Sequence, residues 1–262
     1  DWFPSVALSF PLGKVQMQLA YAADINRPSY RYLRSGVQFD NRVTYESGNP
    51  FLLPTISRNL SYSLSWKWVS LSTMFAHMSN QMCYIIQPYK GDPTLTLLRP
   101  ENMPSFNKMQ ASLSVSPSIG VWHPSFEAMF YKQWFKMNIG QRHSINNPWG
   151  MFNLTNTFDT RWLTASLIVR TRTEGNMENM FTRKGYFGTD LSLHKSLLDG
   201  KLLLQLYASD IFGTADEHVI IYSGEQRTTY LDNHSSSTIT FTLRYRFNSS
   251  KSKYQGSGAG KA

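Results

Sequence analysis

Apolar and polar residues alternate along much of this chain with a period of two. The two clearest runs span residues 60–68 and 239–247. The first alternates Leu60, Tyr62, Leu64, Trp66 and Trp68 with Ser61, Ser63, Ser65 and Lys67. The second alternates Ile239, Phe241, Leu243, Tyr245 and Phe247 with Thr240, Thr242, Arg244 and Arg246. Because successive side chains of a β-strand point to opposite faces, each run predicts a strand with one apolar and one polar face.

Similar runs recur along the rest of the sequence, and helical periodicity is nowhere sustained. They cover residues 6–10, 15–21, 69–78, 82–89, 110–115, 125–134, 151–158, 163–170, 186–194 and 202–210. Together they predict roughly ten to twelve strands of about eight to eleven residues, the length that crosses a bilayer at a tilt. The expected fold class is therefore all-β, an antiparallel transmembrane β-barrel of the bacterial outer membrane.

The polar faces carry mainly Ser, Thr, Gln and Asn, and charged residues are 16% of the chain. This composition suits a barrel interior better than the charged surface of a soluble protein. No segment reaches the roughly eighteen uninterrupted apolar residues of a transmembrane helix. We expect the interior to be lined by Ser63, Ser65, Ser114, Arg170, Arg244 and Arg246. We expect lipid to be faced by Leu64, Trp66, Leu113, Leu167, Phe241 and Leu243.

Aromatic residues gather at the predicted strand ends, where such rings sit at headgroup depth in outer-membrane barrels. They are Trp66 with Trp68, Trp122, Trp134 with Phe135, Trp149, Trp162, and Tyr245 with Phe247. The alternative is a soluble or surface-exposed β-sandwich that uses its rings in a core or to bind glycans. Detergent dependence separates the two, because only the barrel needs a membrane.

The predicted linkers differ in length. Asp199 and Gly200 mark a short turn, whereas residues 34–54 and 173–184 form long polar segments. Outer-membrane barrels have short turns at one end and long loops at the other.

The net charge of +9 includes a basic cluster near the C-terminus, which we expect to be solvated or to face lipid headgroups rather than nucleic acid. We assign residues 1–247 to a barrel segment and residues 248–262 to a flexible polar tail.

Three segments resemble an outer-membrane β-barrel family similar to the TonB-dependent receptors of the Bacteroidetes. Residues 25–33 read INRPSYRYL and residues 46–54 read ESGNPFLLP, close to the paired family patterns INRPSYxxL and EGNPxLxP. Residues 243–261 resemble the end of the same family. Two departures are Ser47, which interrupts the Glu-Gly pair, and Arg34-Ser35, where the family often has Asn-Pro.

This resemblance implies the C-terminal part of a larger transport barrel, which in the family is preceded by more strands and a plug. As partners it implies outer-membrane lipid, the remaining N-terminal strands and plug of the same barrel, TonB-type energy coupling and a surface lipoprotein. The resemblance does not carry over a substrate. We expect the strands at residues 6–10 and 239–247 to be open edges that do not pair with each other.

The motif supplies structural candidates. They are Asn26, Arg27, Pro28, Gly48, Asn49, Pro50 and Pro54, with Phe247 as the strand-terminal aromatic. Pro28 and Pro50 lack a backbone donor and belong where a strand ladder stops. Gly48 permits a positive φ. Arg27 either pairs with a lumen carboxylate such as Glu46 or is a solvated loop residue.

Catalytic, cofactor-binding and metal-binding motifs are missing from the sequence, so we expect no enzyme and no cofactor. The glycine-rich tail lacks the spacing of a phosphate loop, and the six histidines form no His-x-x-x-His pair. Asp210, Asp216 and Glu217 are interpreted as solvated loop carboxylates rather than as an acid/base cluster. Cys83 is the single cysteine and is expected to be a small apolar filler.

Overall fold

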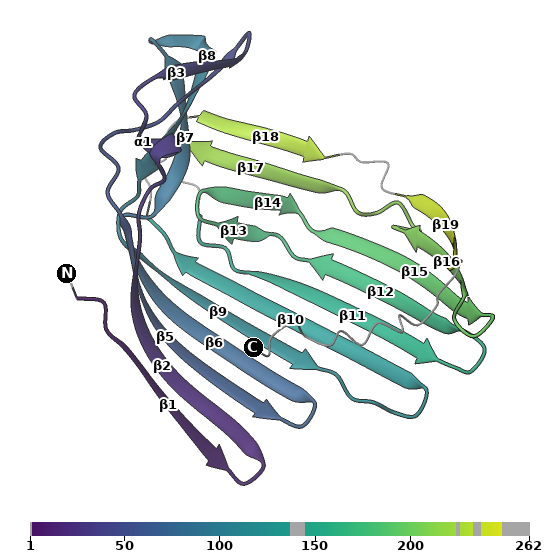
Figure 1. Ribbon diagram of the computed structural model, residues 1–262. Helices are drawn as coiled ribbons and strands as arrows, with labels where there is room; N and C mark the ends of the chain where they lie inside the picture. Colours follow the sequence, from purple (N-terminus) through teal and green to yellow (C-terminus); the bar gives the residue numbers. More distant parts are fainter. Residues whose placement is uncertain (1, 137–144, 224–225, 233–236, 248–262) are drawn as a thin grey trace, which may run out of the picture.

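The computed structural model describes residues 2–136, 145–223, 226–232 and 237–247. Its main element is a curved sheet of eleven strands, each antiparallel to its neighbours (Figure 1). The order across the sheet is β1 (Ser5–Leu12), β2 (Val15–Asn26), β5 (Thr55–Trp66), β6 (Val69–Ser79), β9 (Phe106–Val115), β10 (Trp122–Trp134), β11 (Trp149–Asp159), β12 (Thr164–Arg172), β15 (Tyr186–Leu197), β16 (Leu202–Ser209) and β19 (Thr238–Tyr245).

The register joins apolar residues of neighbouring strands into rows on one face of this sheet. Phe126, Leu154 and Val169 lie side by side across β10, β11 and β12, for example. Leu154 is 38% exposed and Phe241 is 64% exposed, and within the described residues no second layer covers them. An apolar face this broad is accommodated by lipid rather than by water. The β-sandwich alternative is therefore wrong, because a sandwich would cover this face with another sheet.

The predicted orientations agree with the register. The apolar rows contain Leu64, Trp66, Leu113, Leu167, Phe241 and Leu243. The opposite face carries Ser63, Ser65, Ser114, Arg170 and Arg244. Arg246 follows the end of β19 and lines a cavity with Arg244 and Leu203. Among the described residues, no helix is long and apolar enough to cross a membrane.

One end of the sheet, the turn end, is closed by short connections. Gly13 and Lys14 join β1 to β2, and Lys67 and Trp68 join β5 to β6. Residues 160–163 and 198–201 make the same kind of link further along, and residues 116–121 join β9 to β10. The predicted turn at Asp199 and Gly200 is confirmed, with positive φ angles of 53° and 84°.

The opposite end, the loop end, carries long connections that fold into two further sheets (Figure 1). One has the order β3 (Val37–Asn41), β4 (Thr44–Ser47), β8 (Asp92–Asn102) and β7 (Met82–Tyr89), and follows the short helix α1 (Tyr30–Leu33). The other has the order β13 (Gly175–Met177), β14 (Met180–Lys184), β17 (Glu217–Ser223) and β18 (Gln226–Asp232). The long polar segments expected at residues 34–54 and 173–184 thus contain short strands of their own.

The main cluster of buried apolar residues also lies at the loop end. Phe106 and Phe135 meet edge to face with ring centroids 4.8 Å apart, and both are almost completely buried. The cluster consists of Ala76, Met78, Cys83, Met103, Phe106, Phe135 and Ile145. The ends of β6, β9 and β10 are therefore held together by packed side chains, as in a soluble domain.

Several expectations are corrected at this end. Residues 82–89 do form a strand, but β7 belongs to a loop-end sheet and not to the eleven-stranded sheet, which forms the barrel wall. Phe135 is a core residue and Trp149 shares a row with Tyr131 on the polar face, so neither belongs to an aromatic girdle. Trp68 lies in a turn instead of continuing the strand. Asp210 is buried and accepts hydrogen bonds from the backbone N–H groups of Thr214 and Ala215, so it is not a solvated carboxylate.

Both edges of the eleven-stranded sheet are unpaired within the described residues. Within the described residues β1 pairs only with β2, and β19 pairs only with β16, as expected for strands that do not meet. Since the number of alternating strands is odd, β1 and β19 run in the same direction, from the loop end to the turn end. Direct closure of one edge on the other would therefore create a parallel pair in an otherwise antiparallel wall.

Candidate functional site

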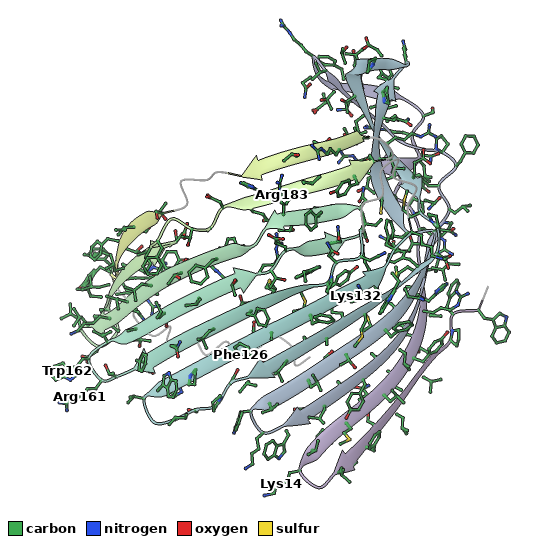
Figure 2. The ribbon with its side chains drawn as sticks, turned by 180° about the vertical axis from the view of Figure 1, so that it is seen from behind. Lys14, Phe126, Lys132, Arg161, Trp162 and Arg183 are labelled. Carbon is green, nitrogen blue, oxygen red and sulfur yellow. The ribbon has the colours of Figure 1, made fainter. Side chains whose placement is uncertain are left out.

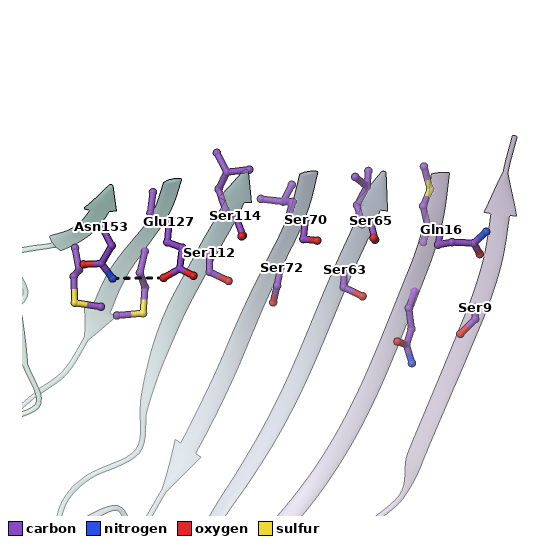
Figure 3. A pocket seen from close by; sticks show the side chains of 18 residues that line it. Ser9, Gln16, Ser63, Ser65, Ser70, Ser72, Ser112, Ser114, Glu127 and Asn153 are labelled. Carbon is purple, nitrogen blue, oxygen red and sulfur yellow. Dashed lines mark hydrogen bonds between the residues drawn. The ribbon is translucent and has the colours of Figure 1, made fainter. Parts of the chain in front are cut away.

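The polar face of the sheet lines a cavity of about 690 Å³ (Figure 3). Small side chains dominate it, and two rows in the strand register supply them. One row runs through Ser9, Gln18, Ser63, Ser72 and Ser112. The next runs through Gln16, Ser65, Ser70, Ser114, Glu127 and Asn153. These serine side chains project little from the sheet and can form hydrogen bonds with water. This part of the cavity therefore suits contact with water and polar solutes.

Glu127 is the charged side chain that lines this cavity. The Nδ2 group of Asn153 donates a hydrogen bond of 3.5 Å to its carboxylate, and Met129 and Met151 lie beside the pair. Figure 3 shows the serine hydroxyls, Glu127 and Asn153 along the same row of strands. The cavity therefore has an uncharged side toward β1 and a more polar side toward β11.

From Asn153 on β11 toward β12 and β15, the polar face of the wall carries ion pairs. Arg170 pairs with Asp190, which also accepts a hydrogen bond of 2.9 Å from the hydroxyl of Tyr207, and Arg172 pairs with Glu217. Arg170, Arg172 and Glu217 line a second cavity of about 440 Å³ next to the first. The interior surface therefore changes from serine to paired charges across the width of the sheet.

A buried amide fixes the base of the loops. Gln133 is fully buried, and its Nε2 group donates to the carbonyl oxygens of Ile145 and Glu178 at 2.6 and 2.9 Å. Its Oε1 atom accepts from the backbone N–H of Glu178 at 2.7 Å and from the hydroxyl of Tyr131 at 3.1 Å. Because a buried amide is costly without partners, this network holds β10 and the segment between β13 and β14 in one arrangement.

Cys83 lies in the same core. Its Sγ atom donates a hydrogen bond of 3.4 Å to the Glu178 carboxylate, and its side chain is buried. Burial, reinforced by the negative charge of Glu178, raises the pKa of the Cys83 thiol. The thiol is therefore protonated and unreactive at neutral pH, which agrees with its expected role as a small filler.

The two motif segments meet at the loop end of β2. The backbone N–H of Asn49 donates a 2.6 Å hydrogen bond to the carbonyl of Tyr32. The buried side chain of Asn49 donates to Pro100 O and Glu101 Oε2, each at 3.1 Å, and accepts from the backbone N–H of Phe51 at 3.0 Å. Asn49 therefore ties the first long loop to β8.

Gly48 is required by space rather than by its φ angle. A Cβ atom there would lie 2.5 Å from Arg34 O and 2.6 Å from Tyr32 O, and Gly48 is not among the glycines with positive φ. The expectation of a positive φ is therefore wrong. Any side chain at Gly48 would separate the two motif segments, because the obstructing atoms belong to the backbone.

The remaining motif residues surround the same junction. Asn26 ends β2, Pro54 immediately precedes β5, and Arg27 and Pro28 line a small cavity with Tyr32. Arg27 is exposed, whereas Glu46 pairs with Arg31 at 3.5 Å and with Arg34 at 3.6 Å. Of the two alternatives for Arg27, the structure favours a solvated loop residue. Pro50 follows Asn49 in a turn.

Phe247 is 82% exposed and follows the last residue of β19 by two positions, at the turn end. Its ring contacts Tyr245 edge to face, with centroids 4.7 Å apart. Its role as the strand-terminal aromatic stays a prediction. The tail assigned to residues 248–262 lies outside the described residues.

Comparison with known families decides the class of this wall. Residues 1–245 match the model of the outer membrane protein beta-barrel family. The chain belongs to this family. It is therefore a bacterial outer-membrane β-barrel chain, and the apolar rows are the lipid-facing surface that the family's fold requires.

Solved structures with the same fold are outer-membrane receptors of Pseudomonas aeruginosa. The siderophore receptor PirA matches with a TM-score of 0.65 and 13% identity, over 88% of this chain and 42% of the receptor. Two mutants of the ferric enterobactin receptor PfeA in complex with enterobactin match with TM-scores of 0.60 and 0.58 and 12% identity, over 93% of this chain and 40% of theirs. The chain thus spans about two fifths of the receptors it matches. No curated protein sequence matches it.

Ser63, Ser65 and Ser114 were expected to face the interior, but the alignment of serines into rows and the amide network were not predicted. The serine rows were visible as the polar half of the alternation, but which serines become neighbours depends on the strand register. Gln133 and Asn176, both fully buried, look like ordinary polar strand and loop residues in the sequence. Only tertiary packing distinguishes them.

Proposed function

We propose that this chain forms part of the wall of an outer-membrane transport barrel of the TonB-dependent receptor type and catalyses no reaction. The observation that carries the proposal is the eleven-stranded sheet itself, with apolar rows on one face and a polar, cavity-lining surface on the other. A wall with lipid on one side and wettable side chains on the other suits the passage of solutes through its interior.

The unpaired edges support a barrel completed by further strands. In hydrocarbon every backbone N–H and C=O group needs a partner, so β1 and β19 each require a neighbouring strand. Because the two edges run in the same direction, an odd number of added strands keeps the whole wall antiparallel. We propose that these strands precede β1 in the same protein, together with a plug.

The other proposed partners follow from the same comparison. The likeness to siderophore and enterobactin receptors supports TonB-type energy coupling through a plug, and the long folded loops offer a surface for a lipoprotein. Two rows of serine side chains along the larger cavity also support a polar solute as cargo.

Uptake by cells that produce the full-length protein tests the proposal. Ser65, Ser70 and Ser114 are consecutive in one row, so Phe at all three positions narrows the interior. We expect deletion of the gene to abolish uptake of one class within a panel of labelled ferric chelates, oligosaccharides and peptides. We expect the triple Ser→Phe variant to reduce that same uptake severalfold.

Val69, Val115 and Leu154 provide the matched control, because they share one row on the lipid side and do not line the cavity. Phe at these three positions should leave uptake unchanged, with equal amounts of both variants in the outer membrane. Equal losses from the two rows, or unchanged uptake across the panel after gene deletion, would contradict a transport wall.

A further inference from the structure

The turn end of the sheet has an excess of basic side chains. We define the turn-end rim as residues 12–15, 66–69, 116–122, 159–164, 197–202 and 245–247. Its acidic residues are Asp159 and Asp199, and its basic residues, all exposed, are Lys14, Lys67, Arg161, Lys201 and Arg246. Lys14, Arg161 and Trp162 extend from the sheet at this end (Figure 2). The positive charges come from separate connections, so they spread along the rim.

These basic side chains have no carboxylate partner within the described residues. The ion pairs lie in the loop half of the structure, at Glu46, Glu101, Asp190 and Glu217. Asp159 instead accepts a 2.8 Å hydrogen bond from the Thr164 hydroxyl. Several arginines of the loop half are therefore neutralised by carboxylates of the chain, whereas none of the rim cations is.

Two of the rim cations are held beside indole rings. Lys67 Nζ lies 5.3 Å from the ring centroid of Trp66, and Arg161 Cζ lies 4.8 Å from that of Trp162. Exposed indoles at the end of a membrane strand sit at headgroup depth. A cation in contact with such a ring is therefore at the level of the lipid phosphates.

We propose that the turn-end rim binds the phosphate groups of anionic phospholipids in the leaflet that the tight turns face. The cations follow the edge of the sheet instead of converging on one point, which fits a lipid surface better than a single small anion. Lys201 extends the surface toward β19, where its carbonyl accepts a 2.8 Å hydrogen bond from the backbone N–H of Arg246. This surface would fix the depth of the barrel in the bilayer and is independent of the cargo.

Fluorescence quenching in bilayers of known composition tests the proposal. The full-length protein is reconstituted in phosphatidylcholine containing a minor fraction of phosphatidylglycerol, with bromine on the acyl chains of one lipid or the other. Bromine quenches nearby indoles, so the two samples report local lipid composition. We expect roughly twofold or greater enrichment of phosphatidylglycerol over its bulk fraction, and we expect it to decline at high salt.

A triple variant, Lys67→Gln, Arg161→Gln and Lys201→Gln, keeps every tryptophan and should bring the enrichment close to one. The control variant, Arg42→Gln, Lys90→Gln and Arg183→Gln, removes the same charge from exposed loop-end sites, and Lys90 lies 5.2 Å from the Tyr89 ring in a matching geometry. It should retain the enrichment. Heat-dependent gel migration confirms folding, and the three single variants, each with a partial loss, replace the triple if it does not fold. No enrichment in the unmodified protein, or equal losses in both triple variants, would overturn the proposal.

Discussion

The two ends of the same sheet are stabilised in different ways. At the loop end, Phe135, Phe106 and their neighbours form a dry core, and Gln133 and Asn49 bridge separate loops through buried hydrogen bonds. At the turn end the described residues form no such core, and rings such as Phe158 are 44% exposed. The loop end is built like a soluble domain, whereas the turn end depends on the bilayer for its apolar environment.

The same alternating pattern of apolar and polar residues therefore occurs in two environments, lipid and packed protein. Along β10, the alternation places Phe126 and Phe130 on the lipid-facing side. Phe135, five residues after Phe130, is instead buried in the protein core at the loop end. Substitutions of the same kind should therefore have different effects at the two ends.

The largest contrast is expected for aromatic truncation. Phe135→Ala should cost about 3–5 kcal/mol of unfolding free energy, because it leaves a cavity in packed protein. Phe158→Ala at the turn end should cost much less, since lipid chains fill the space. Reversible unfolding in detergent or lipid measures both. Similar costs would show that the loop-end core and the lipid-exposed wall are not distinct environments.

A charge placed on the lipid side of the wall gives the next contrast. Leu154→Arg, at the middle of β11, should cost roughly 2–4 kcal/mol, because the guanidinium faces hydrocarbon. Thr155→Arg points to the interior from the next position and should cost far less. The same unfolding assay compares them, and equal costs would mean that the two faces are wrongly assigned.

The motif junction offers a third test at the loop end. Gly48→Ala should destabilise the protein by about 1–3 kcal/mol, because its Cβ meets backbone atoms that cannot move aside. Gly36→Ala is the control, since nothing lies within 4 Å of a Cβ there. Thermal unfolding and proteolysis of the first long loop report the difference. A Gly48→Ala protein as stable as the control would contradict the junction described above.

A smaller effect is expected from alkaline pH. The unfolded thiol of Cys83 has a pKa near 9.0, and the folded pKa is raised, so the folded state holds its proton more tightly. The resulting stabilisation is complete below about pH 9 and is lost as the pH rises further, by at most about 1.4 kcal/mol per pH unit. Cys83→Ala should remove this component of the pH dependence. An unchanged slope of stability against pH would show that the thiol does not contribute.

The wall could be predicted from the sequence because membrane strands expose both faces to a defined medium. Each alternating residue therefore reports its own environment, and runs such as residues 239–247 were readable without knowledge of their neighbours. The open edges were expected from the family resemblance and the need for closure.

The loop end could not be predicted in the same way. Residues 82–89 alternate like a wall strand, and nothing in their pattern reveals that β7 pairs with β8 in a separate sheet. The role of Gly48 depends on backbone atoms of Tyr32 and Arg34 that reach it only in the folded loop. Asp210 was interpreted as solvated because the sequence does not show that the backbone N–H groups of Thr214 and Ala215 donate hydrogen bonds to its carboxylate.

Collision measurements on spin labels along β11 test the central claim, a wall between lipid and an aqueous interior, most directly. Labels are placed one at a time at Phe152, Asn153, Leu154 and Thr155 of the full-length protein in bilayers. We expect a period of two: oxygen, which concentrates in lipid, should reach Phe152 and Leu154, and a water-soluble nickel complex should reach Asn153 and Thr155. Accessibility without this alternation, or nickel contact at all four positions, would contradict it.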